Sequence, residues 1–196
     1  MPRNEEVKFY CRKDEVGFPL SYIIAIDNVA QNLTGHTLTF AMFQTDSSDG
    51  TIKVAETATG ITIQPTQTVT YDSTVGKLKC YQHGLERGYE VIFATSGSLP
   101  SGLTAGQRYF VRDVTEHYFN VCLEPDTTKV TVSTVGSGTH TFYIVGHVQY
   151  SPQSGDFDTV GTYYAWFYDE DAGGNKTSYP RSRYQNSGGG IIVEVE

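Results

Sequence analysis

The run Gly88-Tyr89-Glu90-Val91-Ile92-Phe93 decides the fold class, because turn residues enclose it on both sides. Upstream lies the turn His83-Gly84-Leu85, and downstream lies the turn Leu99-Pro100-Ser101-Gly102-Leu103. Aromatic and β-branched residues between closely spaced Gly and Pro residues are typical of short strands. Strands and turns alternate in this way from Ile61 to Val148, with turns at intervals of roughly 8–12 residues. The spacing predicts a small β-barrel or β-sandwich for this middle segment.

The middle segment is expected to contain a set of strands separated by these turns. They are Thr68–Asp72, Lys77–Cys80, Tyr89–Ala94, Arg108–Arg112, Tyr118–Leu123, Val130–Ser133 and Thr139–Val145. The flanking segments carry a second set, at residues 7–11, Tyr22–Ile26, Leu38–Phe43, Ile52–Thr57, Thr162–Tyr168 and Ile191–Val195.

The aromatic run Thr162–Tyr168 is the strongest strand pattern in the chain. Alternate residues of a strand point to opposite faces, and here both faces carry aromatic side chains. We therefore expect a central strand covered on both sides. Tyr164 and Trp166 are expected to fill the space between two sheets, with Trp166 buried.

The flanking segments resemble the immunoglobulin-like domain of the phage baseplate upper protein family. The residues that carry the resemblance are Phe9-Tyr10, Asp14, Gly17, Leu33-Thr34-Gly35, Phe40, Met42, Gln149-Tyr150, Asp158-Thr159, Gly161 to Phe167, Ala172-Gly173-Gly174 and Ser178-Tyr179-Pro180. In that family the pattern runs without interruption, whereas here about 80 residues intervene after the Leu-Thr-Gly hairpin. The intervening turns, including Gly136-Ser137-Gly138-Thr139-His140-Thr141-Phe142, resemble a small module of tailed-bacteriophage structural proteins.

The two resemblances together imply an all-β chain in which one domain interrupts another. Residues 1–62 and 147–196 are expected to form a discontinuous immunoglobulin-like β-sandwich. Residues 63–146 are expected to form the inserted β domain. An insert of this kind has its two ends close together.

Composition and charge exclude several classes of partner. The net charge of −8 is spread along the chain without a stripe of Lys or Arg, so we expect no nucleic-acid partner. No apolar run approaches the roughly 18–20 residues of a membrane span, and the N-terminus lacks the apolar core of a signal peptide. Cys11, Cys80 and Cys122 are an odd number with no CxxC pair, which favours buried apolar thiols over disulfides.

Candidate chemical sites are few. The spacing of His140 and His147 does not match known metal-ligand patterns. The simpler interpretation is that the histidines of this chain lie in turns or at strand edges. His83 is expected to bond the backbone of its own turn. Asp169-Glu170-Asp171 with Gly173-Gly174 contains calcium-type ligands but lacks the EF-hand spacing, and a solvated hairpin turn is favoured. We therefore expect no catalytic, cofactor-binding or metal-binding residues.

The resemblance implies a non-enzymatic structural component of a tailed-phage virion, placed in the tail, baseplate or neck. Its partners would be other virion proteins, contacted as a symmetric homo-oligomer after assembly in the host bacterial cytoplasm. An alternative is a carbohydrate- or receptor-binding module on the phage surface, in which exposed Tyr163, Tyr179 and Tyr184 stack on sugars. A glycan-degrading enzyme is a third class, disfavoured because the chain shows no catalytic constellation. A serine hydrolase is disfavoured separately, because no Gly-x-Ser-x-Gly nucleophile elbow occurs.

Overall fold

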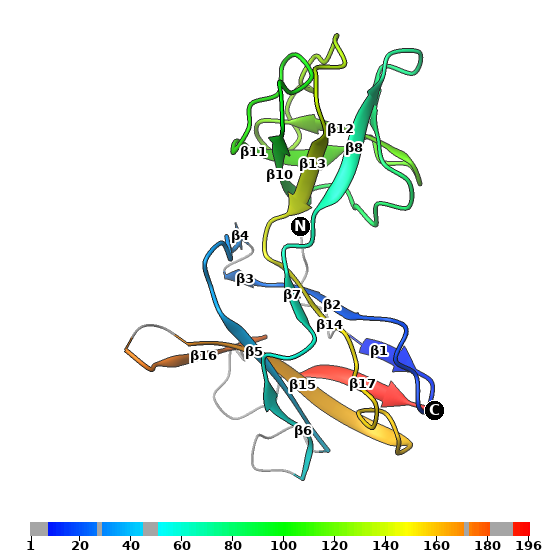
Figure 1. Ribbon diagram of the computed structural model, residues 1–196, viewed down its shortest axis with the longest axis vertical. Helices are drawn as coiled ribbons and strands as arrows, with labels where there is room; N and C mark the ends of the chain where they lie inside the picture. The colour runs from blue at the N-terminus through cyan, green and yellow to red at the C-terminus, as the bar shows by residue number, and fades with distance from the viewer. Residues whose placement is uncertain (1–7, 27–28, 45–50, 171–172, 181–189) are drawn as a thin grey trace. The chain divides into compact units, whose positions relative to one another are not determined.

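The protein is all-β, and the described residues form strands and loops without a helix (Figure 1). The structure, a computed structural model, describes residues 8–26, 29–44, 51–170, 173–180 and 190–196. The chain divides into two compact units. The sandwich unit consists of residues 2–63 and 146–196, and the barrel unit consists of residues 64–145. The divisions lie at 63/64 and 145/146, next to the sequence-based boundaries at 62/63 and 146/147.

One layer of the sandwich unit is a sheet with the strand order β1-β17-β15-β5-β6, and β16 also pairs with β15. The strands are β1 (Lys8–Cys11), β5 (Leu38–Phe43), β6 (Ile52–Thr57), β15 (Gly161–Glu170), β16 (Lys176–Tyr179) and β17 (Ile191–Val195). The pairing of β1 with β17 is parallel, whereas the other pairs are antiparallel. The aromatic strand β15 has paired neighbours on both edges, as expected for a central strand.

The second layer is a sheet with the order β2-β14-β7, built from β2 (Leu20–Ile23), β14 (His147–Tyr150) and β7 (Ile61–Ile63). A two-stranded ribbon of β3 (Ala25–Ile26) and β4 (Val29–Ala30) follows β2. Between the layers, the rings of Phe40 and Tyr150 stack with centroids 3.8 Å apart, and Tyr22 lies 6.3 Å from Phe167. This apolar core joins the two layers into a β-sandwich.

The core-facing side of β15 differs from the prediction. Tyr163, Ala165 and Phe167 point into the core, whereas Tyr164 and Trp166 lie on the opposite face, so the prediction that Tyr164 and Trp166 fill the inter-sheet space is wrong. Trp166 is nevertheless buried, at 8% exposure, as predicted. Its ring packs edge-on against Phe43 at 5.7 Å. It also lies so close to Gly190 that a Cβ there would come within 2.8 Å of the indole.

The barrel unit is a closed barrel with the strand order β10-β11-β12-β9-β8-β13. Its strands are β8 (Gln67–Asp72), β9 (Lys77–Lys79), β10 (Glu90–Thr95), β11 (Arg108–Arg112), β12 (Tyr118–Cys122) and β13 (His140–Ile144). Phe93, Tyr109, Phe119 and Phe142 meet in its interior with ring centroids 5.4–6.1 Å apart. These aromatic rings fill a barrel of this strand number without leaving room for a channel.

The loops that contain Ser98 and Ser137 lie against each other in the barrel unit, and their close contact requires glycine at position 136. The backbones of Ser98 and Ser137 form a β-bridge, and their hydroxyl groups lie 2.9 Å apart. Gly136 has φ +71°, and a Cβ there would come within 2.3 Å of the Ser98 carbonyl oxygen. A residue with a side chain is therefore excluded at Gly136 both by space and by backbone conformation.

Several strand predictions need correction. The predicted strand Val130–Ser133 is absent, and Ser133 instead donates its N–H to the Ser101 hydroxyl at 2.9 Å. The predicted strand Tyr22–Ile26 is split, because Ile24 leaves the sheet and donates its N–H to the Gly146 carbonyl at 2.8 Å. Strands β4, β7, β14 and β16 were not predicted; β4 lies between the predicted strands Tyr22–Ile26 and Leu38–Phe43.

Excision of the barrel unit is expected to leave a folded sandwich unit. Ile63 in β7 is paired directly with Val148 in β14, so the two cut ends already lie next to each other in one sheet. Replacing residues 64–145 with Asn-Gly would turn these two strands into a hairpin with a short loop. Circular dichroism and amide hydrogen exchange are expected to show a cooperative β fold. An unfolded product would contradict the independence of the two units.

Candidate interaction surface

The histidines singled out in the sequence have structural roles. The His83 Nδ1 accepts the Leu85 N–H at 2.9 Å, so the predicted bond to the backbone of its turn is confirmed. His140 lies within hydrogen-bond distance of the Thr95 hydroxyl at 2.9 Å and the Val135 carbonyl at 3.0 Å, which ties a loop to β10. His83, His140 and His147 are all buried, and His140 and His147 are the first residues of β13 and β14.

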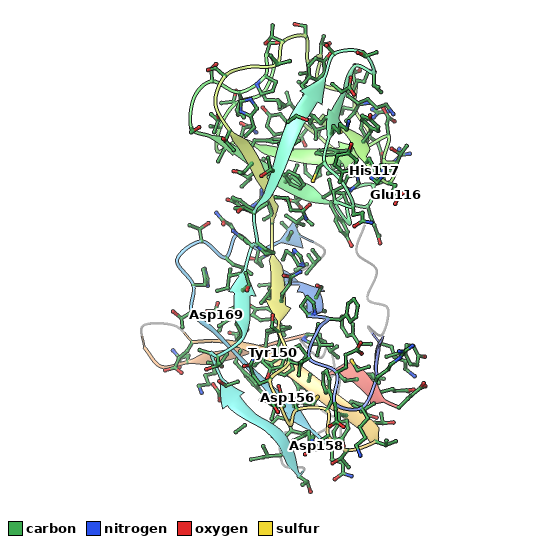
Figure 2. The ribbon with its side chains drawn as sticks, turned by 45° about the vertical axis from the view of Figure 1, so that its right-hand side comes forward. Glu116, His117, Tyr150, Asp156, Asp158 and Asp169 are labelled. Carbon is green, nitrogen blue, oxygen red and sulfur yellow. The ribbon has the colours of Figure 1, made fainter. Side chains whose placement is uncertain are left out.

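Asp169 and Glu170, predicted to lie in a hairpin turn, are instead the last two residues of β15, and each lies within 4 Å of a basic side chain. Asp169 Oδ2 lies 2.7 Å from His36 Nδ1, and Glu170 lies 3.6 Å from the Lys176 ammonium (Figure 2). Asp171 lies outside the described residues. Among the residues that the structure describes, no three His, Cys, Asp or Glu side chains are grouped closely enough to hold a metal ion.

The tyrosines considered for sugar stacking do not form a platform. Tyr163 and Tyr179 are buried, at 2% and 6% exposure, so the expectation that they are exposed is wrong. The Tyr163 hydroxyl donates to the Thr159 carbonyl at 2.9 Å, which fixes the start of β15. Tyr184 lies outside the described residues.

The carboxylates are engaged as hydrogen-bond acceptors. Hydrogen bonds from Lys176, Lys53 and Arg87 lower the pKa of Glu56, Asp158 and Asp126, respectively. Asp156 accepts the Tyr150 hydroxyl at 2.5 Å and the Gln153 N–H at 2.6 Å (Figure 2). A general acid that works at neutral pH needs a raised pKa. The pKa values of Glu56, Asp158 and Asp126 are lowered instead, and the Asp156 carboxylate holds a turn by accepting the Gln153 N–H.

An apolar groove of about 430 Å³ lies on the sandwich unit, where β1 is the edge of one sheet and β2 is the edge of the other. It is lined by Phe9, Tyr10, Cys11, Arg12, Glu15, Phe18, Pro19 and Leu20. Leu20 and Cys11 belong to the sandwich core, whereas the rings of Tyr10 and Phe18 are 66% and 73% exposed. Val16, at 54% exposure, adds a third apolar side chain to this segment.

The loop between β1 and β2 is held by backbone hydrogen bonds. Asp14 has φ +62° and donates its N–H to the Phe157 carbonyl at 2.9 Å, and Lys13 donates to the Glu196 carbonyl at 2.8 Å. The Glu15 carboxylate accepts the Arg12 N–H at 2.9 Å. Phe18 is thus presented from a pinned loop and Tyr10 from the paired strand β1, which lowers the entropy lost when a partner covers the two rings.

The groove carries little reactive chemistry. Burial, assisted by the nearby Glu15 carboxylate, raises the pKa of the Cys11 thiol to about 11. The thiol is therefore protonated at neutral pH and is a poor nucleophile. Cys11, Cys80 and Cys122 are all buried and free, as the sequence predicted.

The groove was not predicted, because the sequence Gly17-Phe18-Pro19-Leu20 indicates only a bend in the chain. The available signal was the large aromatic residue Phe18 inside a Gly/Pro turn, a place where the chain has little chance to bury it.

Among the described residues no helix is long and apolar enough to cross a membrane. Comparisons of the chain with protein-family models, with curated proteins and with solved structures give no match.

Proposed function

We propose that the protein is a non-enzymatic structural component of a tailed-phage virion, in the tail, baseplate or neck, and that it acts through protein–protein contacts. The resemblance of the flanking segments to the baseplate upper protein family supports this proposal. Two compact β units in one chain also suit it, because they offer separate surfaces to neighbouring subunits. In this proposal the sandwich unit is immunoglobulin-like, and the protein occupies the assembled particle as a symmetric homo-oligomer.

The observation that carries the proposal is the groove lined by the exposed Tyr10 and Phe18, with the exposed Val16 in the same loop as Phe18. Exposed aromatic side chains that line one groove, here from β1 and from the pinned loop that follows it, are typical of protein interfaces. Burying each ring against a neighbouring virion subunit contributes roughly 1.5–3 kcal/mol. Such a contact is weak alone, but the symmetry of a particle repeats it and multiplies its effect.

The test is the double substitution Tyr10→Ser with Phe18→Asp. It is expected to lower incorporation of the protein into particles by at least about tenfold, which corresponds to a loss of ~1.4 kcal/mol or more per contact. Incorporation is measured by quantifying the chain in purified particles, and electron microscopy of labelled particles gives its position. Val160→Asp is the matched control, because Val160 is 63% exposed in the same unit but does not line the groove.

Two results would contradict the proposal at different levels. Unchanged incorporation of the double variant would exclude the groove as the attachment surface. Hydrolysis of a cell-wall or capsule glycan by the purified protein, abolished by a single Asp or Glu substitution, would exclude the non-enzymatic function itself.

A further inference from the structure

A patch of aromatic and cationic side chains lies on the outside of the barrel unit, around the turn that follows β9. In β9, Leu78 points into the barrel and is 2% exposed, so its neighbours Lys77 and Lys79 point outward. Lys79 is paired across the sheet with Tyr118 at the start of β12. Tyr81, two residues after β9, is 68% exposed.

Two side chains of this patch, those of Lys79 and His117, lie against the exposed ring of Tyr81, and Lys79 also lies over Tyr118. The Lys79 ammonium nitrogen lies 5.1 Å from the centroid of the Tyr81 ring and 5.7 Å from that of Tyr118. The imidazole of His117 lies 4.9 Å from the Tyr81 ring, at an angle of 59° to it. Most of the Tyr81 ring therefore stays open to solvent while a cation and a hydrogen-bonding imidazole flank it.

The turn that presents Tyr81 is fixed and strained. Cys80 donates its N–H to the His117 carbonyl at 3.0 Å, and Gln82 donates its N–H to the His117 Nδ1 at 3.4 Å. Gln82 has φ +49°, in the left-handed region that residues with a side chain rarely occupy. Strain of this kind persists where surrounding contacts enforce it, and it is concentrated at ligand-binding sites.

The ammonium of Lys79 has no carboxylate within 4.0 Å among the described residues. The carboxylate of Asp72 is occupied instead by the Thr74 N–H at 3.0 Å, the Val75 N–H at 3.2 Å and the Tyr118 hydroxyl at 3.3 Å. Glu116 lies beside His117 rather than Lys79, at 3.9 Å (Figure 2). Lys79 interacts electrostatically with the Asp72 carboxylate but makes no ion pair within 4.0 Å among the described residues, so its ammonium keeps N–H donors that a ligand can use.

We propose that Lys79, Tyr81, His117 and Tyr118 form a binding site for an acidic sugar. The open face of Tyr81 stacks on the apolar face of a pyranose ring, and the Lys79 ammonium pairs with the sugar's carboxylate. His117 offers its Nε2 to a sugar hydroxyl. A neutral sugar would leave Lys79 without a function, and a simple anion would leave the Tyr81 ring unused.

Single-stranded nucleic acid also combines rings and charges, but it binds along a groove of many positive charges. The patch offers Lys77 and Lys79 only, and the Lys77 ammonium already lies 3.4 Å from the Asp113 carbonyl. The acidic sugar is therefore the better fit. This proposal stands independently of the virion proposal.

The probe is hexagalacturonate, titrated into the isotopically labelled full chain and followed through amide chemical shifts. Saturable shifts around residues 79–82 and 117–118 are expected, with a dissociation constant on the order of 0.1–1 mM. Tyr81→Ala and Lys79→Gln are each expected to weaken binding at least about tenfold, whereas Lys79→Arg keeps the charge and retains binding. Raising the salt concentration weakens binding, because the carboxylate pairs with an exposed cation.

Tyr10→Ala is the matched control, because Tyr10 is as exposed as Tyr81 but lies in the sandwich unit. It is expected to leave hexagalacturonate binding unchanged. The absence of shifts at this patch, or equal losses for Tyr10→Ala and Tyr81→Ala, would overturn the site. Equally tight binding of neutral cellohexaose, or tighter binding of a single-stranded hexanucleotide, would overturn the assignment to acidic sugars.

Discussion

Replacing Phe167 by alanine is expected to lower the free energy of unfolding of the sandwich unit by about 3–5 kcal/mol. Phe167 has no exposed surface, and its ring packs between Phe40 at 5.3 Å and Tyr22 at 6.3 Å. The substitution removes a ring that joins the two layers, and the surrounding strands cannot close the cavity without shifting both sheets. The lost stability therefore includes both the transfer of the ring to water and the cavity left behind.

Fluorescence of Trp166 in a denaturant titration measures this effect, because the chain has one tryptophan and it lies in the sandwich unit. Tyr168→Ala is the matched control: Tyr168 is the next residue of β15, but it is half-buried on the opposite face. We expect it to cost clearly less than Phe167→Ala. Equal losses for the two variants would mean that the two faces of β15 contribute alike, contrary to the packing described above.

Acidification is expected to destabilise the sandwich unit through His147. Its Nδ1 is buried without a hydrogen-bond partner among the described residues, and burial lowers the pKa of His147 from 6.5 to about 4. The folded state thus resists protonation more than the unfolded state does. Stability is fully present above pH 6.5 and falls as the pH drops towards 4. The loss over this range is about 3 kcal/mol, from 1.36 kcal/mol per pKa unit.

The measurement is the denaturation midpoint of the Trp166 signal at a series of pH values between 7.5 and 4. His147→Gln is expected to flatten the curve over this range, whatever it costs at pH 7.5, because glutamine does not titrate. His117→Gln is the control, since His117 lies in the barrel unit and the Trp166 signal keeps its dependence on pH. A parent protein whose midpoint is constant from pH 7.5 to 4 would show that His147 is not held neutral by burial.

The sequence predicts strands best where apolar residues alternate and turn residues follow. Strands β5, β6, β11 and β17 have the predicted bounds for this reason. Strands β7 and β14 are short, and they become strands only by pairing with each other and with β2. Their formation depends on tertiary contacts rather than on local pattern. Val130–Ser133 has strand-forming residues, but the Ser101 side chain takes the hydrogen bond that a partner strand would need.

The face of β15 that packs into the core is a second feature that the sequence did not predict. Both faces carry aromatic residues, so the alternation of residues does not show which face points into the core. The face with Tyr163, Ala165 and Phe167 belongs to the core in which Phe40 and Tyr150 stack between the layers. The exposure of Tyr10 could not be predicted either, because it depends on β1 becoming the edge of a sheet, whereas the Gly/Pro turn around Phe18 gives a local signal in the sequence.

The barrel's place between β7 and β14 has a consequence for the order of folding during synthesis. Every strand of the barrel lies within residues 64–145, whereas β5 must pair with β15, whose residues are synthesised after the barrel. The barrel can therefore fold first on the ribosome, and it then holds Ile63 and Gly146 near each other. A loop of about 80 residues is thereby shortened to a few, which reduces the entropic cost of closing the sandwich by about 3 kcal/mol. The inserted barrel would thus act as an internal folding aid for the sandwich that contains it.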